Sequence, residues 1–179
     1  MSVIGCRIVL YAFLAVVAWQ DGCYGRIPVR LAECTLLIGL LLYSIEGPAG
    51  MAWYLWRFVV FASLFFLLHL LGMMGGGDWK IFGLVGALTG WHQGFCIIGL
   101  ALLTAGIFSV SRMLCGWRLY SRLQLFFWYC RRCFSSRRLY QYPSAGDDLD
   151  RIRLGGFVLI GAVIDGVWRL VYYFWSIVG

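Results

Sequence analysis

Long apolar runs separated by short polar segments dominate this chain. Six runs are candidates for helices that cross the hydrocarbon core of a bilayer, which needs roughly 20 residues. They cover residues 3–19, 31–45, 53–71, 81–91, 94–114 and 154–177. The fourth run is short, so we expect its helix to extend back through Asp78 or forward past His92. Tight turns are expected at 46–50 and 91–94, which contain glycine or proline. The pattern predicts an all-α polytopic membrane helical bundle with about six transmembrane helices.

Composition supports the bilayer as the solvent of this chain. Of its 179 residues, 62% are hydrophobic and only 13% are charged, and the mean hydropathy is +0.83. A soluble domain is closer to half apolar. We therefore expect residues 1–179 to form a single membrane-embedded domain.

The net charge of +7 has an uneven distribution. Twelve of the 15 basic residues lie in three segments, 26–30, 80 and 112–153, between apolar runs. Positive charge on alternate loops is typical of the cytoplasmic side of a membrane protein. This predicts an external N-terminus and a cytoplasmic position for Asp21, Asp78 and the basic loop 115–153. A nucleic-acid surface would more often combine basic residues with aromatic platforms on a folded domain, so no nucleic-acid partner is expected.

Two segments need separate comment. The first run begins near Arg7 and ends in Val16-Val17-Ala18, which is similar to a cleavable signal peptide; we expect an uncleaved first span. The loop 115–153 contains arginine pairs and the aromatic stretch 126–129. It is therefore expected to lie at the lipid headgroups as an amphipathic segment.

The seven cysteines lie mostly in apolar segments and are expected to be unpaired small side chains. Cys130 and Cys133 form one CxxC motif. A structural zinc site needs four ligands, and neither a second pair nor a nearby histidine exists. We expect neither a metal nor a cofactor.

Two aspartates stand where apolar runs meet water: Asp21 in the segment 19–28 and Asp78 after three glycines. An acidic group beside a membrane span is costly to desolvate and is a functional hypothesis by default. Two such carboxylates that meet in space can share a proton and a water, as in aspartic proteases. Alternatively, Asp21 is a polar loop residue paired with Arg26, and Asp78 is a helix N-cap.

The glycines before Asp78 have two interpretations. Missing side chains leave room for a substrate and permit backbone conformations, positive φ among them, that are closed to other residues. Exposed backbone groups can also pair with an extended peptide. Alternatively, the run is a flexible hinge.

These motifs resemble the prepilin peptidases, the GxGD-type aspartic proteases of membranes. The similarity rests on an aspartate and a proline with six residues between them, the last of which is isoleucine, and on a GxGD-x-K motif with a matching glycine spacing downstream. The residues are Asp21, Ile27, Pro28, Gly75, Gly77, Asp78, Lys80, Gly83, Gly86 and Gly90. The segment 153–157 resembles the glycine-containing start of the family's last span. The chain differs from the usual pattern at Cys23 and Val29.

The resemblance implies an aspartic endopeptidase of type IV pilus or related secretion systems. It would lie in the bacterial inner membrane and cut the leader of a pilin-like precursor, after a glycine, at the cytoplasmic face. Asp21 and Asp78 would be catalytic, and Gly75, Gly77, Lys80 and Pro28 would bind substrate. The insertion with two CxxC pairs found in larger, methylating members is missing here, so the chain resembles the short, protease-only form.

The remaining polar groups of the apolar segments have helix-neighbour spacings. Glu33 follows Arg30 by three residues and Asp165 precedes Arg169 by four, which predicts pairing within each helix. His69 is expected to make an interior hydrogen bond or to line the site.

Two other functions stay open. A proton-coupled transporter or channel would use the acids Asp21, Asp78, Glu33 and Asp165 as relays. A catalytically inactive relative would act only in assembly of a secretion system.

Overall fold

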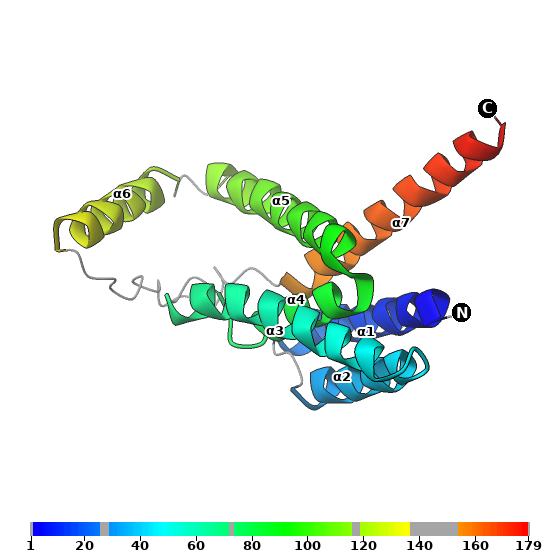
Figure 1. Cartoon of the computed structure of the whole chain (residues 1–179). Coiled ribbons are helices and arrows are strands. Elements are labelled where there is room, and N and C mark those ends of the chain that lie inside the picture. Colours follow the sequence, from blue (N-terminus) through cyan, green and yellow to red (C-terminus); the bar gives the residue numbers. More distant parts are fainter. Residues whose placement is uncertain (1, 26–28, 72–73, 116–118, 137–153, 179) are drawn as a thin grey trace.

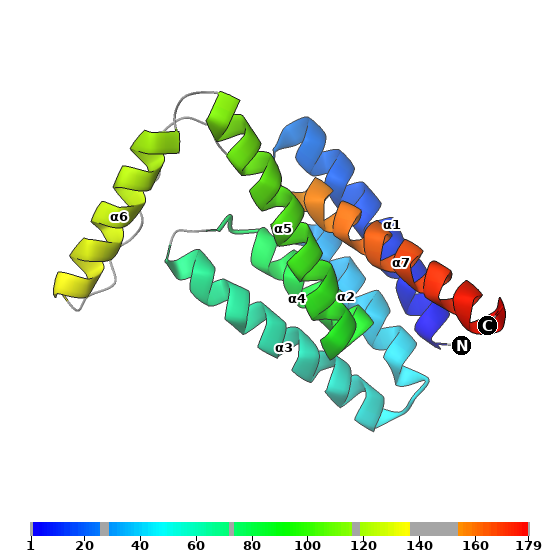
Figure 2. The same cartoon turned by 90° about the horizontal axis from the view of Figure 1, so that it is seen from above.

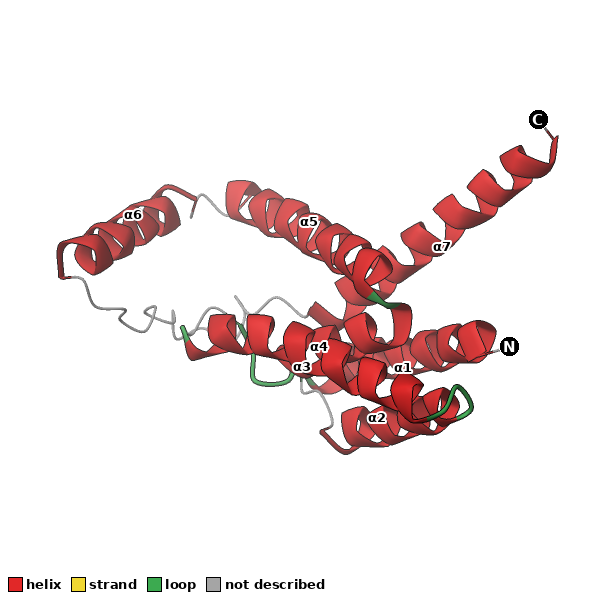
Figure 3. Cartoon of the chain, viewed as in Figure 1, coloured by secondary structure: helices red, strands yellow, loops and turns green. Residues whose placement is uncertain are grey.

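The computed structural model describes residues 2–25, 29–71, 74–115, 119–136 and 154–178. Within these ranges every regular element is an α-helix and no strand occurs (Figure 3). The helices are α1 (Ser2–Tyr24), α2 (Val29–Ser44), α3 (Pro48–Leu70), α4 (Asp78–Thr89), α5 (Trp91–Cys115), α6 (Leu119–Ser136) and α7 (Leu154–Val178). The all-α prediction is confirmed.

Four of these helices are long and apolar enough to cross a membrane: α1, α3, α5 and α7. Helices α2 and α4 have 16 and 12 residues. At 1.5 Å per residue they are about 24 and 18 Å long, against a hydrocarbon core of roughly 30 Å. The predicted count of about six spans is therefore not confirmed.

Helix α1 continues five residues beyond the predicted end at residue 19, because its stop signal is Gly25. This glycine has a φ of 62°, and its N–H donates to the carbonyl of Asp21 at 3.1 Å. A left-handed glycine with this hydrogen bond is a common helix C-terminus. Asp21 thus lies in the last turn of α1, and its interpretation as a loop residue is wrong.

Helix α4 begins at Asp78, as one of the two predicted extensions requires. It ends before Gly90, whose φ of 87° reverses the chain in a single residue. The turn predicted at 91–94 is wrong, because Trp91 is already the first residue of α5. The turn predicted at 46–50 is a shorter connection, in which Gly47 has a φ of 84° and α3 begins at Pro48.

Helix α4 forms the centre of the bundle. All its residues from Ile81 to Leu88 are buried, as expected for a helix that is apolar all round. It contacts α3 and α5 most extensively and also touches α1, α2 and α7. Glycines allow this close packing: a Cβ on Gly86 would overlap the ring of Phe61, and a Cβ on Gly94 would lie 2.9 Å from the Gly86 Cα.

Helices α1 to α5 run in alternating directions (Figure 2). The end of α1, the start of α4 and the start of α7 consequently lie at the same end of the bundle. Helix α7 packs against α5 and α1, and its C-terminal part projects away from the other helices (Figure 1). Helix α6 lies apart from the bundle in both views. The segment predicted as a basic loop thus contains a helix, and its residues 116–118 and 137–153 lie outside the described ranges.

Packing at Gly86 gives a test of this arrangement. Gly86→Ala would place a methyl group against the buried ring of Phe61 and should lower the free energy of unfolding by about 1–3 kcal/mol, the usual cost of overpacking. Gly99→Ala in α5 is the control, because a Cβ there meets nothing within 4 Å. Thermal unfolding of both variants in detergent measures the difference, and equal midpoints would contradict the packing of α3, α4 and α5 described here.

Candidate active site

Asp21 is a buried acidic residue, with 6% of its surface exposed. The last turn of α1 places its side chain against the start of α7. There, Oδ2 of Asp21 accepts a hydrogen bond from the backbone N–H of Gly155 at 3.0 Å. Gly155 is the second residue of α7, so its N–H has no acceptor within its own helix. Two segments 134 residues apart in the chain therefore meet at this carboxylate.

Asp78 is the first residue of α4 and is half-buried. Its Oδ2 accepts a hydrogen bond from the backbone N–H of Gly75 at 3.1 Å, and its own N–H donates to the Gly75 carbonyl at 3.3 Å. The N-cap position is occupied by Gly77. The interpretation of Asp78 as the N-cap is therefore wrong, and its carboxyl group instead turns back over the glycine run.

The two carboxyl groups influence each other. Asp78 lies outside the four candidate spans, and burial raises its pKa from 3.8 to about 6. The negative charge of Asp21 acts in the same direction, while the Gly75 N–H and the nearby His69 act against it. The two acidic side chains are thus close enough to interact electrostatically. Two nearby carboxylates do not both ionise readily, so Asp78 keeps its proton to a higher pH than an isolated aspartate does.

The glycine run leaves space for the carboxyl group of Asp78, and its backbone geometry at Gly77 is ordinary. Gly77 has a φ of −94°, which any residue adopts. The expectation of a positive φ in the glycine run is therefore wrong at Gly77. A Cβ on Gly75 would lie 2.7 Å from Oδ2 of Asp78, closer than packed atoms allow. A Cβ on Gly76 would make an ordinary contact of 3.5 Å with Cε1 of His69.

The other residues of the motifs are placed as follows. Lys80 turns toward its neighbour, with Nζ 5.4 Å from the centre of the Trp79 ring. His69 makes an interior hydrogen bond, as expected: its Nδ1 lies 3.0 Å from the carbonyl oxygen of Met74, to which it donates. Pro28 lies outside the described residues.

Further polar groups lie elsewhere. The predicted pair in α7 is confirmed, with 2.8 Å between Nε of Arg169 and Oδ2 of Asp165. Arg30 and Glu33 are both exposed, and no ion pair joins them. The described cysteines are free thiols, of which Cys6 is buried. No cluster of three histidine, cysteine or acidic side chains suited to a metal occurs in the described ranges.

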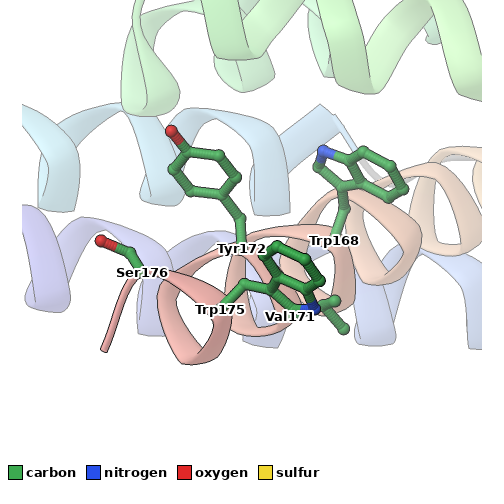
Figure 4. Close-up of a pocket in the computed structure, with 5 residues that line it drawn as sticks. All are labelled: Trp168, Val171, Tyr172, Trp175 and Ser176. Atoms are coloured by element: carbon green, nitrogen blue, oxygen red, sulfur yellow. The ribbon is translucent and has the colours of Figure 1, made fainter. Parts of the chain in front are cut away.

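A hollow of about 420 Å³ lies on α7 and is lined by Trp168, Val171, Tyr172, Trp175 and Ser176 (Figure 4). All five residues belong to one helix and are mostly apolar. Trp168 is 13 residues beyond Gly155, which is about 20 Å along the helix axis. The hollow is therefore separate from the two aspartates.

Comparison with known proteins finds one family model that matches the part of the chain containing both aspartates. Residues 8–110 match the model of the type IV leader peptidase family, and this segment is more than half of the 179-residue chain. The chain belongs to the type IV leader peptidase family. Both aspartates lie in the matched segment, whereas α6 and α7 lie beyond it. No curated protein and no solved structure matches the chain.

Membership makes this chain a peptidase of the prepilin-peptidase kind, and its apolar helices make it a membrane protein. Two features of the site were not assigned from the sequence. One is the Gly155 N–H, whose only signal was the resemblance of the segment 153–157 to the glycine-containing start of the family's last span. The other is the charge of His69, which acts on Asp78.

The glycine run of this leader peptidase gives a test with a built-in control. Gly75→Ala should displace the Asp78 carboxyl group and lower peptidase activity by about tenfold or more, because small misplacements of reacting groups are costly. Gly76→Ala adds the same methyl group one residue later, where the contact is ordinary, and should keep most of the activity. Cleavage rates per amount of folded protein measure both. Equal rates for the two variants would show that Asp78 does not depend on the space at Gly75.

Proposed function

We propose that this leader peptidase is an aspartic endopeptidase that uses Asp21 and Asp78 to remove the leader of pilin-like precursors. One observation carries the proposal: a buried Asp21 lies close enough to Asp78 to help raise its pKa to about 6. Groups with perturbed titration cluster at functional sites. A pair that holds one proton has both an acid and a base available for hydrolysis.

In the proposed reaction, Asp21 is ionised and acts as the general base. It removes a proton from a water molecule whose oxygen attacks the scissile carbonyl carbon. Asp78 is protonated and donates its proton to the carbonyl oxygen, which gives a neutral tetrahedral diol. Asp21 then gives its proton to the amide nitrogen, while Asp78 takes a proton from one hydroxyl of the diol. The C–N bond breaks, a carboxylic acid and an amine are released, and Asp21 is again ionised and Asp78 again protonated.

The substrate would approach Asp78 along the glycine run. Gly75 and Gly76 are exposed. The N–H and carbonyl groups of Gly75 are bonded to Asp78, so the backbone groups of Gly76 are the ones available to pair with an extended leader segment. We propose that Gly75, Gly77, Lys80 and Pro28 contact the precursor. Resemblance to the prepilin peptidases further suggests a cut after a glycine, before the apolar stem of the precursor.

We also propose that the aspartates face the cytoplasm of a bacterial inner membrane. Arg30, Lys80 and Arg112 lie near those helix ends that share the side of Asp21 and Asp78, and positive charge favours the cytoplasmic side. Helix α6 would rest on the lipid headgroups of the same side. It exposes Phe126 and Phe127 together with Arg131 and Arg132, a combination typical of interfacial helices.

The transporter hypothesis has less support. Asp165 is paired with Arg169, Glu33 is exposed, and the other two acids gather at one end of the bundle. A proton relay would instead distribute acids through the membrane depth. The hypothesis of an inactive relative is an outcome of the experiment below.

The central prediction concerns the pair itself. Asp21→Asn and Asp78→Asn should each reduce cleavage of a co-expressed precursor from the same genome by a factor of about a thousand or more, because asparagine cannot exchange the proton. Asp165→Asn is the matched control, since it changes an aspartate of a membrane helix outside the site. Precursor and product are separated on gels, with enzyme amounts in the membrane normalised.

Full cleavage by either asparagine variant would remove that aspartate from the catalytic pair. A wild-type chain that processes none of its own genome's pilin-like precursors would favour the inactive relative.

The pH dependence follows from Asp78. Its raised pKa means that this group is protonated below about pH 6 and loses its proton above. Both carboxylates are then charged, and no acid remains to protonate the carbonyl. For the reconstituted enzyme, kcat/KM should fall by about tenfold per pH unit above the midpoint, because this parameter follows the titration of the free enzyme. A flat profile between pH 5 and 8 would contradict the assignment of the proton to Asp78.

A further inference from the structure

We infer that Gly155, at the start of α7, is a positioning residue of the active site that orients the carboxylate of Asp21. This inference rests on the proposed function and extends it to a helix that lies beyond the segment matched by the family. Gly155 acts in two ways: its N–H binds the carboxylate, and its lack of a side chain lets α7 approach α1.

The close approach is visible in the contacts that a side chain would make. A Cβ on Gly155 would lie 3.0 Å from Oδ2 of Asp21, 3.1 Å from Cγ1 of Val17 and 3.2 Å from Cβ of Asp21. These atoms have little freedom to move, because Val17 is fully buried and Asp21 nearly so. Any larger residue would therefore shift α7 or turn the carboxyl group. The neighbouring Gly156 has nothing within 4 Å of its Cβ position.

Packing further along α7 determines which of its N–H groups reaches Asp21. The hydroxyl of Tyr11 in α1 donates to the carbonyl of Ala162 at 3.1 Å. A Cβ on Gly161 would lie 2.7 Å from the carbonyl oxygen of Ile97 in α5. Helix α7 is thus held against α1 on one side and α5 on the other, and this register places Gly155 opposite Asp21.

The electrostatic need for Gly155 arises from the position of Asp21. The C-terminal end of a helix carries partial negative charge, which disfavours an anion in its last turn. Asp21 occupies the last turn of α1. The N-terminal end of α7 carries partial positive charge, and its first N–H groups have no acceptor within their own helix. The hydrogen bond from Gly155 therefore fixes the direction in which Oδ2 of Asp21 points.

The test compares Gly155→Ala and Gly155→Val with Gly156→Ala and Gly156→Val. Each pair adds the same atoms to adjacent positions of one helix, so effects on helix formation are matched. Both Gly155 variants should lower kcat, by a few-fold for alanine and by about a hundredfold for valine, a scale set by displacements of up to 1 Å. KM should change little. The Gly156 variants should stay close to wild type.

Combination with Asp21→Asn separates positioning from simple packing. If Gly155 acts through Asp21, Gly155→Ala should leave the residual rate of Asp21→Asn unchanged. A further fall in that rate, by the factor seen in the wild-type background, would show a general packing defect and would overturn the inference. So would equal rates for Gly155→Ala and Gly156→Ala. If instead the Asp21→Asn enzyme remains active, the proposed function itself fails, which is a separate outcome.

Discussion

The structure depends on the placement of one carboxylate away from water. Asp21 is buried in the last turn of α1, where both desolvation and the end of the helix disfavour its charge. The compensating hydrogen bond comes from Gly155, at the far end of the chain. A residue so poorly suited to its local surroundings is typical of a functional site. The packing of α7 against α1 and α5 can be understood as the arrangement that brings this donor to Asp21.

Helix α4 supplies the second carboxyl group in a different way. Its short, wholly buried body is surrounded by the longer helices, and glycines such as Gly86 allow them to approach. The helix therefore has little freedom to move, and its first residue, Asp78, is held near Asp21. The two acids differ in their surroundings. Asp21 is nearly buried and accepts an N–H from another helix, whereas Asp78 is half-buried and accepts one from its own glycine run. That difference separates the proposed roles of base and acid.

Much of this architecture was predictable from the sequence, because apolar runs and helix-neighbour charges are local signals. The four long helices and the Asp165–Arg169 pair follow from them, and the start of α4 at Asp78 is one of the two extensions that they left open. The two errors in helix boundaries occurred where one residue changes the local structure. Helix α1 continues past Asp21 because its stop signal is the left-handed Gly25, and Gly90 alone joins α4 to α5.

Other features depend on tertiary contacts that no local pattern encodes. The hydrogen bond from Gly155 to Asp21 joins residues 134 positions apart. Likewise, the pKa of Asp78 reflects burial by helices that are distant in the chain. Aspartate motifs alone indicated that two acids are special, and only the packed bundle distinguishes them.

The most direct test of the account is an infrared titration of the carboxyl C=O band in the purified protein. The account predicts one protonated carboxyl group that persists to about pH 6 and disappears in Asp78→Asn. In Asp21→Asn the same band should titrate at lower pH, because the neighbouring negative charge has been removed. An identical midpoint in the wild type and in Asp21→Asn would show that the two carboxyl groups do not interact, and would contradict the account.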